Sequence, residues 1–224
     1  MREGERRAII GPNGAGKTTL FNAIAGEVPV SSGRVRFAGR DVTRLRTHRR
    51  AALGIGRTYQ ITNLFPALTV EENVQLAVQS LTPRKFSLLG VGAPRGEDAA
   101  RVDEALATSG LTARRRDATR TLSYGEQRQL EFALALASKP ALLLLDEPAA
   151  GLSAAERVVM ASTIGALPRS LTLVLIEHDI DLALRLVDHV TCMHNGSVLV
   201  EGSPDAIRAN ARVQEVYLGR PHDA

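Results

Sequence analysis

The sequence predicts an α/β fold built on a mostly parallel sheet. Segments with strand character alternate with segments of helical spacing, and this alternation favours parallel strands joined by helical crossovers. Two of the strand candidates, 141–147 and 171–179, are continuous apolar runs, which is typical of strands covered on both faces. A chain of 224 residues with 44% hydrophobic and 23% charged residues can bury a large core, so we expect one folded unit with an appended subdomain.

Composition limits the kinds of protein that this chain can be. The formal charge of +4 comes from many arginines and only three lysines, scattered rather than gathered into one run, and it fits acidic lipid or a phosphate ligand about as well as nucleic acid. A single cysteine, Cys192, leaves no disulfide framework and no thiol-ligated metal site, which favours a reducing cytoplasm. No stretch approaches the roughly 20 apolar residues that cross a bilayer, and the first ten residues lack the apolar run of a signal peptide. We therefore expect a soluble chain that can dock on a membrane protein.

The N-terminal half predicts a strand at 6–10, a glycine-rich loop, and a helix that ends at Gly26. Alternating apolar residues and glycine turns from 28 to 42 favour exposed antiparallel strands, and 47–53 has helical character. Thr69 and Glu72 have the spacing of a capping box at a helix start. Proline and glycine from 80 to 98 indicate an excursion that offers a contact surface, and a helix follows from about 98 to 109.

The C-terminal half begins with a second capping box, Ser123 and Glu126, in the stretch LSYGEQRQLE. The helix that follows should bury Leu130, Ala133, Leu134 and Ala137 on one face and stop before Pro140. After the two apolar strands we expect a helix over 180–188, and then a hairpin whose turn at 195–196 is asparagine–glycine, the pair that suits a type I′ turn. Ser203 followed by proline predicts a short helix near the end of the chain.

The loop GPNGAGKTT matches the pattern of phosphate-binding loops and lies between a predicted strand and a predicted helix, which is the context that the pattern requires. Its backbone N–H groups would surround phosphates at the helix N-terminus, Lys17 would reach the β and γ oxygens, and Thr18 would hold Mg²⁺. The alternative, a plain glycine-rich turn, is disfavoured by that context. The predicted loop residues are Gly11, Pro12, Asn13, Gly14, Ala15, Gly16, Lys17, Thr18 and Thr19.

Polar residues at the ends of the apolar strands complete the candidate site. Asp146 closes the first strand, where a carboxylate can hold Mg²⁺, and Glu147 follows it, where an acid can polarise an attacking water. Taken without the loop, these two are as well explained by solvated acids at a strand end. His178 ends the second apolar strand, but a lone histidine is more often structural. Gln60 is, from its position, only a polar group at the end of a short strand.

The motifs GPNGAGKTT, Gln60, LSYGEQRQLE, LLLLDEP, AAGLS and IEHD occur in the order and approximate spacing of the ATP-binding cassette (ABC) ATPases, and the chain resembles that family over nearly its whole length. The sequence of these motifs and of the stretches LIEHDIDLALRLVDHV and VQEVYLG is similar to that of the ATP-binding subunits of branched-chain amino acid transporters. The resemblance implies a P-loop NTPase fold with a mostly parallel core sheet, a helical subdomain and a truncated antiparallel β subdomain. It implies one domain over 1–224, with 1–60 and 140–224 as a RecA-like core carrying the β subdomain and about 61–139 as the helical signature subdomain.

The resemblance also assigns roles. It implies that Gly11–Thr19 is the Walker A loop, that Gln60 contacts Mg²⁺ and senses the γ-phosphate, and that 149–153 forms the D-loop. Asp146 is similar to the Walker B aspartate, Glu147 to the catalytic base and His178 to the switch histidine. The implied metal ligands are Thr18, Gln60 and Asp146. LSYGE looks like the signature motif, with Tyr124 and Glu126 in place of the commoner glycine and glutamine; Ser123, Gly125 and Glu126 would then contact ATP bound by a facing subunit.

The function implied is ATP hydrolysis, with ATP and Mg²⁺, that powers import of branched-chain amino acids or related compounds. The implied partners are a second ABC ATPase subunit, identical or not, and transmembrane permease subunits with a solute-binding protein, at the cytoplasmic face of the plasma membrane. The alternatives are another ABC system, such as lipopolysaccharide export, and a truncated cassette that binds ATP but hydrolyses it poorly. A nucleic-acid-linked ABC protein is disfavoured because no second cassette or long coiled coil is present, so we expect no nucleic acid partner.

One departure from the family concerns the start of the chain. Only ten residues precede Gly11, whereas the family usually has roughly two dozen or more, with a strand pair and an aromatic residue that stacks on adenine. On this basis we expect a β subdomain with fewer pairing partners and a nucleotide affinity lower by about threefold to tenfold. A misassigned start, a trimmed sequence and a truncated gene product all remain open.

Overall fold

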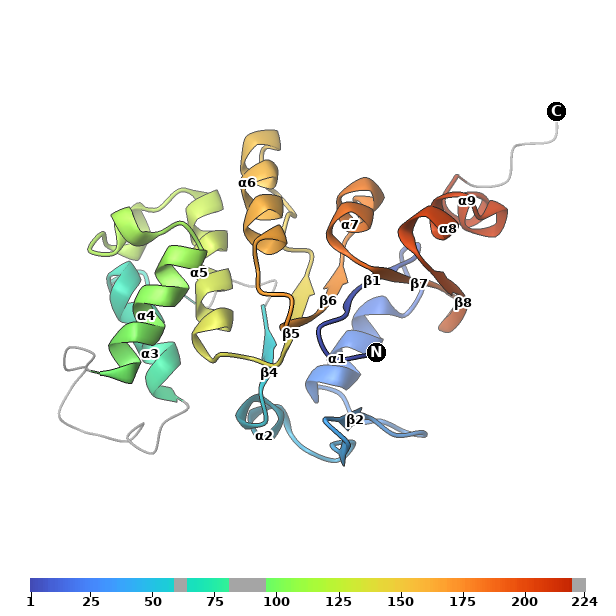
Figure 1. The fold of residues 1–224 in the computed structure, drawn as a ribbon, viewed down its shortest axis with the longest axis horizontal. Coiled ribbons are helices and arrows are strands. Elements are labelled where there is room, and N and C mark those ends of the chain that lie inside the picture. Colours follow the sequence, from blue (N-terminus) through green and yellow to red (C-terminus); the bar gives the residue numbers. More distant parts are fainter. Residues whose placement is uncertain (59–63, 81–95, 219–224) are drawn as a thin grey trace.

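The structure, a computed structural model, describes residues 1–58, 64–80 and 96–218. Its main feature is a six-stranded sheet in the order β4-β5-β6-β1-β7-β8, in which every neighbouring pair is parallel except β7 and β8. The strands are β1 (Arg6–Ile10), β4 (Ile55–Arg57), β5 (Leu142–Asp146), β6 (Thr172–Ile176), β7 (His189–His194) and β8 (Ser197–Gly202). The predicted mostly parallel α/β fold is confirmed (Figure 1).

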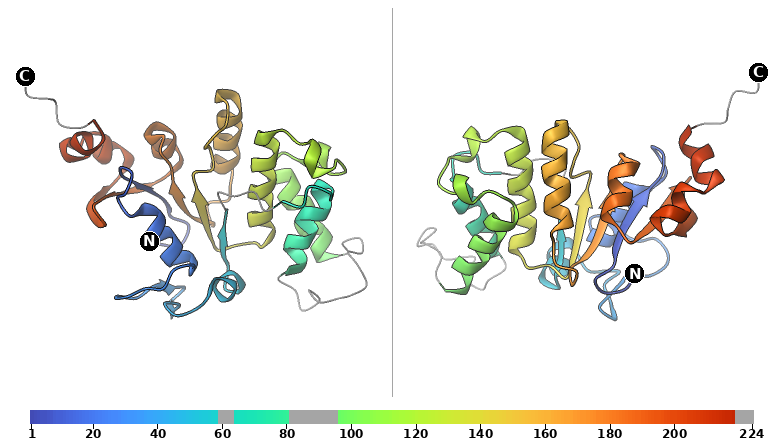
Figure 2. Two further views of the ribbon diagram at one scale, coloured as in Figure 1. Left: turned by 180° about the vertical axis from the view of Figure 1, so that it is seen from behind. Right: turned by 45° about the horizontal axis from the view of Figure 1, so that its top comes forward.

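Helices surround this sheet, and a second, two-stranded antiparallel sheet lies at one end of the molecule (Figures 1 and 2). The helices are α1 (Lys17–Ala25), α2 (Thr47–Ala52), α3 (Val70–Ser80), α4 (Glu97–Thr108), α5 (Tyr124–Ala137), α6 (Ala154–Gly165), α7 (Ile180–Leu186), α8 (Pro204–Arg208) and α9 (Ala211–Leu218). The small sheet consists of β2 (Arg36–Phe37) and β3 (Arg40–Asp41). In the part of the chain that the structure describes, no helix is long and apolar enough to span a bilayer.

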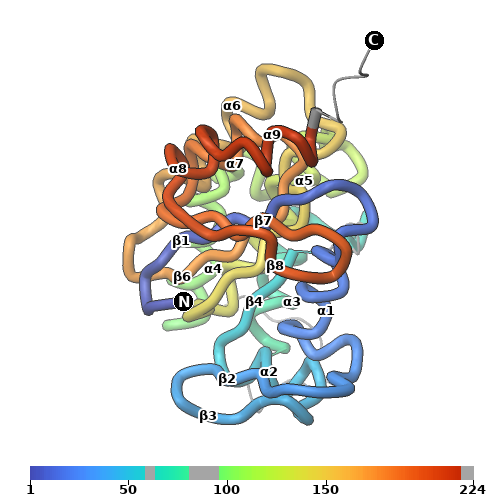
Figure 3. The backbone as a smooth tube through the Cα atoms, turned by 90° about the vertical axis from the view of Figure 1, so that its right-hand side faces the viewer, coloured from blue at the N-terminus to red at the C-terminus, as the bar shows by residue number. Residues whose placement is uncertain are grey.

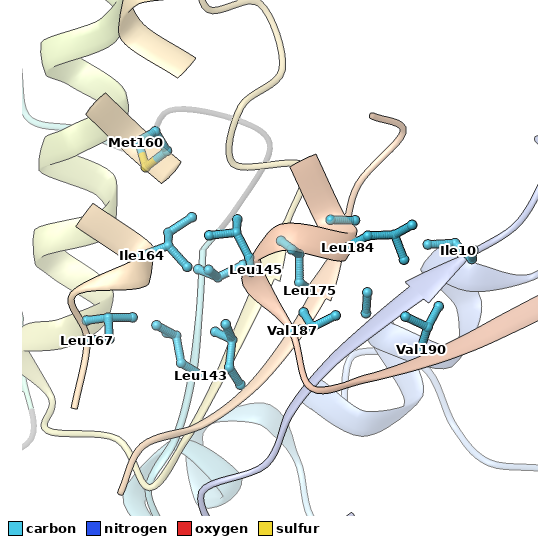
Figure 4. Close-up of a cluster of buried hydrophobic side chains, with 14 of the residues drawn as sticks. Ile10, Leu143, Leu145, Met160, Ile164, Leu167, Leu175, Leu184, Val187 and Val190 are labelled. Carbon is cyan, nitrogen blue, oxygen red and sulfur yellow. The ribbon is translucent and has the colours of Figure 1, made fainter. Parts of the chain in front are cut away.

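Both faces of the main sheet are covered by helices. On one face Phe21 of α1 packs in a cluster with Leu144 and Ile176. On the other face, side chains of α6 and α7 such as Ile164 and Leu184 pack on the strands (Figure 4). All five residues of β5 are buried, which explains why its sequence is apolar throughout.

Helices α3, α4 and α5 form a separate group beside the β4 edge of the sheet (Figure 1). Their own apolar cluster includes Val74 of α3, Leu106 of α4 and Leu130 of α5. Helix α5 also contributes Phe132 to the cluster of the main sheet. This helix therefore joins the helical group to the core.

The helix starts predicted from capping residues are confirmed. Thr69 and Glu72 bond reciprocally at the start of α3, with Thr69 N donating to Glu72 Oε2 at 2.7 Å. Ser123 N donates to Glu126 Oε2 at 2.8 Å, and Glu126 N donates to Ser123 Oγ at 3.2 Å. Ser203 caps α8, and the hairpin turn has left-handed φ values of 49° at Asn195 and 76° at Gly196. The apolar face expected for α5 is also correct: Leu130, Ala133 and Ala137 are buried, and Leu134 packs on them.

Other expectations differ from the structure. The apolar run 171–179 is a strand only as far as Ile176, which pairs with the last residue of β5, Asp146. The antiparallel strands expected over 28–42 are reduced to two residues each by the turn between them and by the bends at 31–33. Helices α6 and α9 were not anticipated, although α6 begins with its own capping box, Ser153 and Glu156. Most of the excursion expected over 80–98 lies outside the described residues.

Candidate functional site

The carboxyl ends of three adjacent strands bring the predicted site residues to one edge of the sheet. Asp146 of β5 pairs in register with Ile176 of β6, which pairs with Ile9 of β1. The glycine-rich loop follows β1, Asp146 ends β5 and Glu147 comes next, and His178 follows β6 by two residues. Parallel strands thus place three segments that are distant in sequence side by side, at the edge where α/β proteins bind ligands.

The loop after β1 has a conformation that its glycines make possible. Gly16, the residue before α1, has φ 93°, and Gly11 has φ 151°. A side chain at Gly11 would collide with the carbonyl oxygen of Met193 on β7. The loop is also held from the other side, because Gly196 N donates to Ala15 O at 3.1 Å. Strand, close-fitting loop and helix follow one another as the phosphate-binding pattern requires.

Lys17 lies at the first position of α1 and is buried, with 6% of its surface exposed. Its Nζ donates to two loop carbonyls, Gly11 O at 2.7 Å and Pro12 O at 3.1 Å. Burial lowers the pKa of Lys17, and the nearby carboxylates of Glu147 and Asp146 oppose that shift. A cationic group is therefore held against the loop at a helix N-terminus, where a polyanion would find favourable charge. Thr18 and Thr19 are exposed on the same first turn.

Asp146 is 2% exposed and forms an ion pair with Arg57 of β4, whose Nη2 lies 3.0 Å from Asp146 Oδ2. Arg57 also contacts Glu27 Oε2 at 2.8 Å and Asn22 Oδ1 at 2.7 Å, and its guanidinium lies 5.2 Å from the centre of the Phe21 ring. Burial raises the pKa of Asp146, and Arg57 opposes that shift. Arg57 therefore fixes the orientation of this carboxylate, and no sequence pattern pointed to that role.

The second oxygen of the same carboxylate, Asp146 Oδ1, is buried and has no hydrogen-bond donor among the residues that the structure describes. A buried carboxylate oxygen normally has a partner, so this atom can take one more. Mg²⁺ prefers oxygen ligands from one or two protein groups together with phosphate and water. Asp146 and the exposed hydroxyl of Thr18 are such ligands, and the residues present fit the ion.

Glu147 has a left-handed backbone, with φ 50°, which is uncommon and costly for a residue other than glycine. The conformation is held by bonds on both sides: Glu147 N donates to Ile176 O at 2.9 Å, and Ala150 N donates to Glu147 O at 3.0 Å. The carboxylate is partly exposed and lies 2.8 Å from Nε2 of His178, Oε1 being the nearer atom. Glu147 and His178 are thus brought together as a pair at the open edge of the sheet.

Glu177 is a second acid at this edge, and it was missed from the sequence. It is 4% exposed, and its Oε1 accepts a hydrogen bond from Ala149 N at 2.9 Å. Burial raises the pKa of Glu177 above its ordinary value. It therefore ties the segment after Glu147 to the strand end that carries His178. Its position directly after the apolar strand β6 could have marked Glu177 as a candidate site residue.

Residues 122–126, which lead into α5 and which we call the elbow, are bonded to the segment 149–153 of the same chain. The Tyr124 hydroxyl lies 3.4 Å from Ala150 O and accepts from Arg128 Nη2 at 2.9 Å, while the Tyr124 ring lies against Gly151. The backbone of Gly125 bonds to the carboxylate of Glu156. The sequence showed Tyr124 only as a departure from the commoner glycine of the signature motif. In the structure this side chain joins the start of α5 to residues 150 and 151.

The elbow does not lie beside the glycine-rich loop of its own chain. In Figures 1 and 2, α5 and α1 stand on opposite sides of β4 and β5. Helix α5, which Ser123 caps and which contains Gly125 and Glu126, therefore lies apart from α1. Gln60, the remaining one, lies outside the described residues.

Comparisons with known proteins identify what this arrangement resembles. Residues 1–150 match the family model described as ABC transporter, and residues 197–223 match that described as branched-chain amino acid ATP-binding cassette transporter. The high-affinity branched-chain amino acid transport ATP-binding protein BraF of Pseudomonas aeruginosa is 36% identical over 95% of this chain and 86% of its own length.

The solved structures that resemble this chain are also ATP-binding cassettes. An ATP-binding cassette of an ABC transporter in its ADP conformation superposes with a TM-score of 0.84 at 28% identity, over 97% of this chain and 89% of that one. A cassette dimer in a post-hydrolysis state with ADP and phosphate has a TM-score of 0.75 at 28% identity, over 91% of this chain and 87% of that one.

Proposed function

Because the chain belongs to the ABC transporter family as an ATP-binding, ATP-hydrolysing subunit, we propose that it powers the import of branched-chain amino acids or related compounds. The substrate class is supported by the match of residues 197–223 to the model of branched-chain amino acid cassettes, and by the similarity to BraF. The observation that carries the chemistry is the sheet edge where the Lys17 loop, Asp146 and the Glu147–His178 pair meet.

In this proposal the loop Gly11–Thr19 binds the phosphates of ATP. Its backbone N–H groups and the N-terminus of α1 face the negative charge, and Lys17 exchanges its loop carbonyls for phosphate oxygens. Asp146 and Thr18, with Gln60, hold Mg²⁺, which when bound neutralises charge on the phosphate oxygens. Arg57 keeps Asp146 Oδ2 occupied, so that Oδ1 is the atom left for the ion.

Glu147 acts as the base. Its partly exposed carboxylate can accept a proton from a water molecule, and its 2.8 Å contact with His178 Nε2 holds it in one orientation. The left-handed backbone of Glu147 is bonded to Ile176 on one side and to Ala150 on the other, so the base is positioned by the strand ends themselves. His178 orients the carboxylate and contacts the terminal phosphate region from the neighbouring strand.

Ser123, Gly125 and Glu126 serve the nucleotide of a second cassette. Their distance from the loop of their own chain supports this assignment, as does the dimeric state of the solved ADP and phosphate complex. The helical group α3–α5 within about 61–139 forms the subdomain that moves with the signature, against a core of 1–60 and 140–224. Permease subunits with a solute-binding protein then hold the dimer at the cytoplasmic face of the membrane.

Replacing Glu147 by Gln tests the assignment of the base. The amide keeps the shape and the contact to His178 but cannot accept the proton, so we expect ATP turnover to fall by at least about a hundredfold while ATP binding is retained. Phosphate release and equilibrium nucleotide binding measure the two effects. Glu104→Gln makes the same change of charge at an exposed acid on α4 and should leave turnover unchanged. Near-normal turnover in Glu147→Gln would refute the role of Glu147.

A further inference from the structure

Positive charge is concentrated on one part of this molecule that the nucleotide site does not use. Residues 28–54 contain seven arginines and one aspartate, a net charge of +6, whereas the whole chain carries +4. The rest of the chain is therefore net negative. The sequence had indicated scattered positive charge, but six of these arginines are exposed on β2, β3, α2 and the turns between them, a region that we name the basic arm: Arg34, Arg36, Arg40, Arg44, Arg46 and Arg49.

The arginines of the basic arm differ from most others in having no acid to pair with. None of the six forms an ion pair with any residue in the described ranges. Outside the arm, paired arginines include Arg7, Arg101, Arg114, Arg115, Arg169 and Arg208. The single acid of the arm, Asp41, accepts a hydrogen bond from Thr43 N at 2.9 Å and interacts electrostatically with Arg34 and Arg36, but one carboxylate leaves the arm at +6. This surface keeps its charge for an external partner.

The arm is rigidly attached to the core. The seventh arginine, Arg50, is 1% exposed, and its guanidinium donates to backbone carbonyls only. It bonds Ala23 O and Ile24 O at the end of α1, both at 2.6 Å, and Thr43 O in the arm at 3.0 Å. Because the backbone of the arm is already held, only the exposed arginine side chains have to be ordered on binding, which favours association.

The position of the arm separates it from the phosphate-binding loop. The loop precedes the first turn of α1, whereas the arm follows the last turn. Figure 3 shows β2, β3 and α2 together at the end of the molecule opposite α8 and α9. A hollow of about 470 Å³ lies in the arm, with Arg34 and Arg44 among its lining residues. The hollow is therefore separated from the phosphate-binding loop by the length of α1.

We propose that the basic arm binds the surface of a membrane that contains anionic phospholipid. This rests on the proposed function only in that a transporter subunit works beside a bilayer. An anionic leaflet attracts each nearby arginine with roughly 1 kcal/mol, within a screening length of about 10 Å. Nucleic acid fits less well, because single-strand binders stack bases on exposed aromatic rings and the one aromatic residue of the arm, Phe37, packs against the core cluster of α1.

Flotation of the intact chain with lipid vesicles tests the proposal without any transport or ATPase readout. We expect the chain to bind vesicles of equimolar phosphatidylglycerol and phosphatidylcholine, to ignore pure phosphatidylcholine vesicles, and to dissociate at high salt. The variant Arg40→Gln/Arg44→Gln/Arg46→Gln should bind the anionic vesicles at least about tenfold more weakly, since three attractions are lost. Failure of transport with intact vesicle binding would count against the proposed function and leave this inference standing.

The matched control is Arg116→Gln/Arg120→Gln/Arg185→Gln, which removes the same charge from exposed arginines outside the arm. It should keep its vesicle binding, and both triple variants should keep the thermal unfolding temperature of the parent. Equal loss in the two variants would mean that only net charge matters and would overturn the proposal. So would equal binding to neutral vesicles, or displacement from anionic vesicles by RNA or by inorganic phosphate at equal charge concentration.

Discussion

Glu177 illustrates how a single residue contributes to the site without touching the nucleotide. It is buried, and its carboxylate joins Ala149 to the strand that leads to His178. Its ionised form is disfavoured by burial first, and the neighbouring Glu147 and Asp179 add to that effect. The folded protein therefore holds a proton on Glu177 more tightly than the unfolded chain does.

The sign of the resulting pH dependence follows directly. Because the pKa of Glu177 is raised in the folded state, this residue contributes stability below its ordinary value of 4.5, and the contribution is lost as pH rises through the raised value. Glu177→Gln keeps an oxygen for Ala149 N but cannot ionise. We expect the free energy of unfolding of the variant, relative to that of the parent, to improve as pH rises from about 5 to about 8 in urea titrations. A difference that stays constant with pH would contradict this assignment.

Residue type and spacing predict candidate site residues such as Lys17, Asp146 and Glu147, and the structure brings the segments that carry them to one edge of the sheet. Their roles toward a nucleotide stay predictions, and the residues that hold them in place were missed. Arg57 was missed because its contacts with Asp146 and Glu27 depend on the pairing of β4 with β5, which no local pattern discloses.

At the scale of elements, the start of α5 and the loop before α6 form one contact. Gly151 has φ 74°, and a Cβ there would lie 3.0 Å from atoms of the Tyr124 ring. The loop thus needs glycine twice, for its backbone and for the close approach of the ring. A substitution of Gly151 or of Tyr124 should therefore disturb both the loop and the start of α5.

Gly151→Ala should lower the free energy of unfolding by about 1 to 3 kcal/mol, because alanine is strained at this φ and displaces Tyr124. Gly165→Ala is a control, since Gly165 is the last residue of α6 and a Cβ added there would meet no atom within 4 Å. That control should be neutral or stabilising by up to about 1 kcal/mol. Urea titrations of both variants measure the free energy of unfolding. Equal effects of the two substitutions would show that the contact between Gly151 and Tyr124 is not tight.

Elements were predicted where capping residues or apolar periodicity are strong, as for α3, α5 and the hairpin of β7 and β8. Helix α6 was not predicted, although Ser153 and Glu156 have the spacing of a capping box at its start. Strand lengths were overestimated because a strand ends where its neighbour ends, and neighbours are set by tertiary structure.

At the scale of the whole molecule, the separation of α5 from α1 supports our proposal that one chain carries parts of two different sites (Figure 1). In a two-fold dimer the loop of each chain would face the elbow of the other. A complete site would therefore need residues from two chains.

Mixing two inactive variants tests it. A dimer of Lys17→Met chains lacks both loops, and a dimer of Ser123→Arg chains lacks both elbows, whereas a mixed dimer retains one complete site. Random exchange of subunits should restore roughly a quarter of the parental ATP turnover. The control is each variant mixed with itself at the same total concentration. No recovery after verified exchange would mean that the elbow serves its own chain.

Helix α1 carries the phosphate-binding loop at one end and the bonds from Arg50 at the other. Its nine residues form a rod of about 14 Å, and the last carbonyls, which a helix leaves without internal partners, are the ones that Arg50 bonds. A tilt of this rod when phosphate enters the loop would be transmitted to the basic arm, because the helix cannot shorten and the joint is closed by hydrogen bonds. If phosphate binding tilts α1, the angle of the basic arm would change with it, at the end of the helix farthest from the loop.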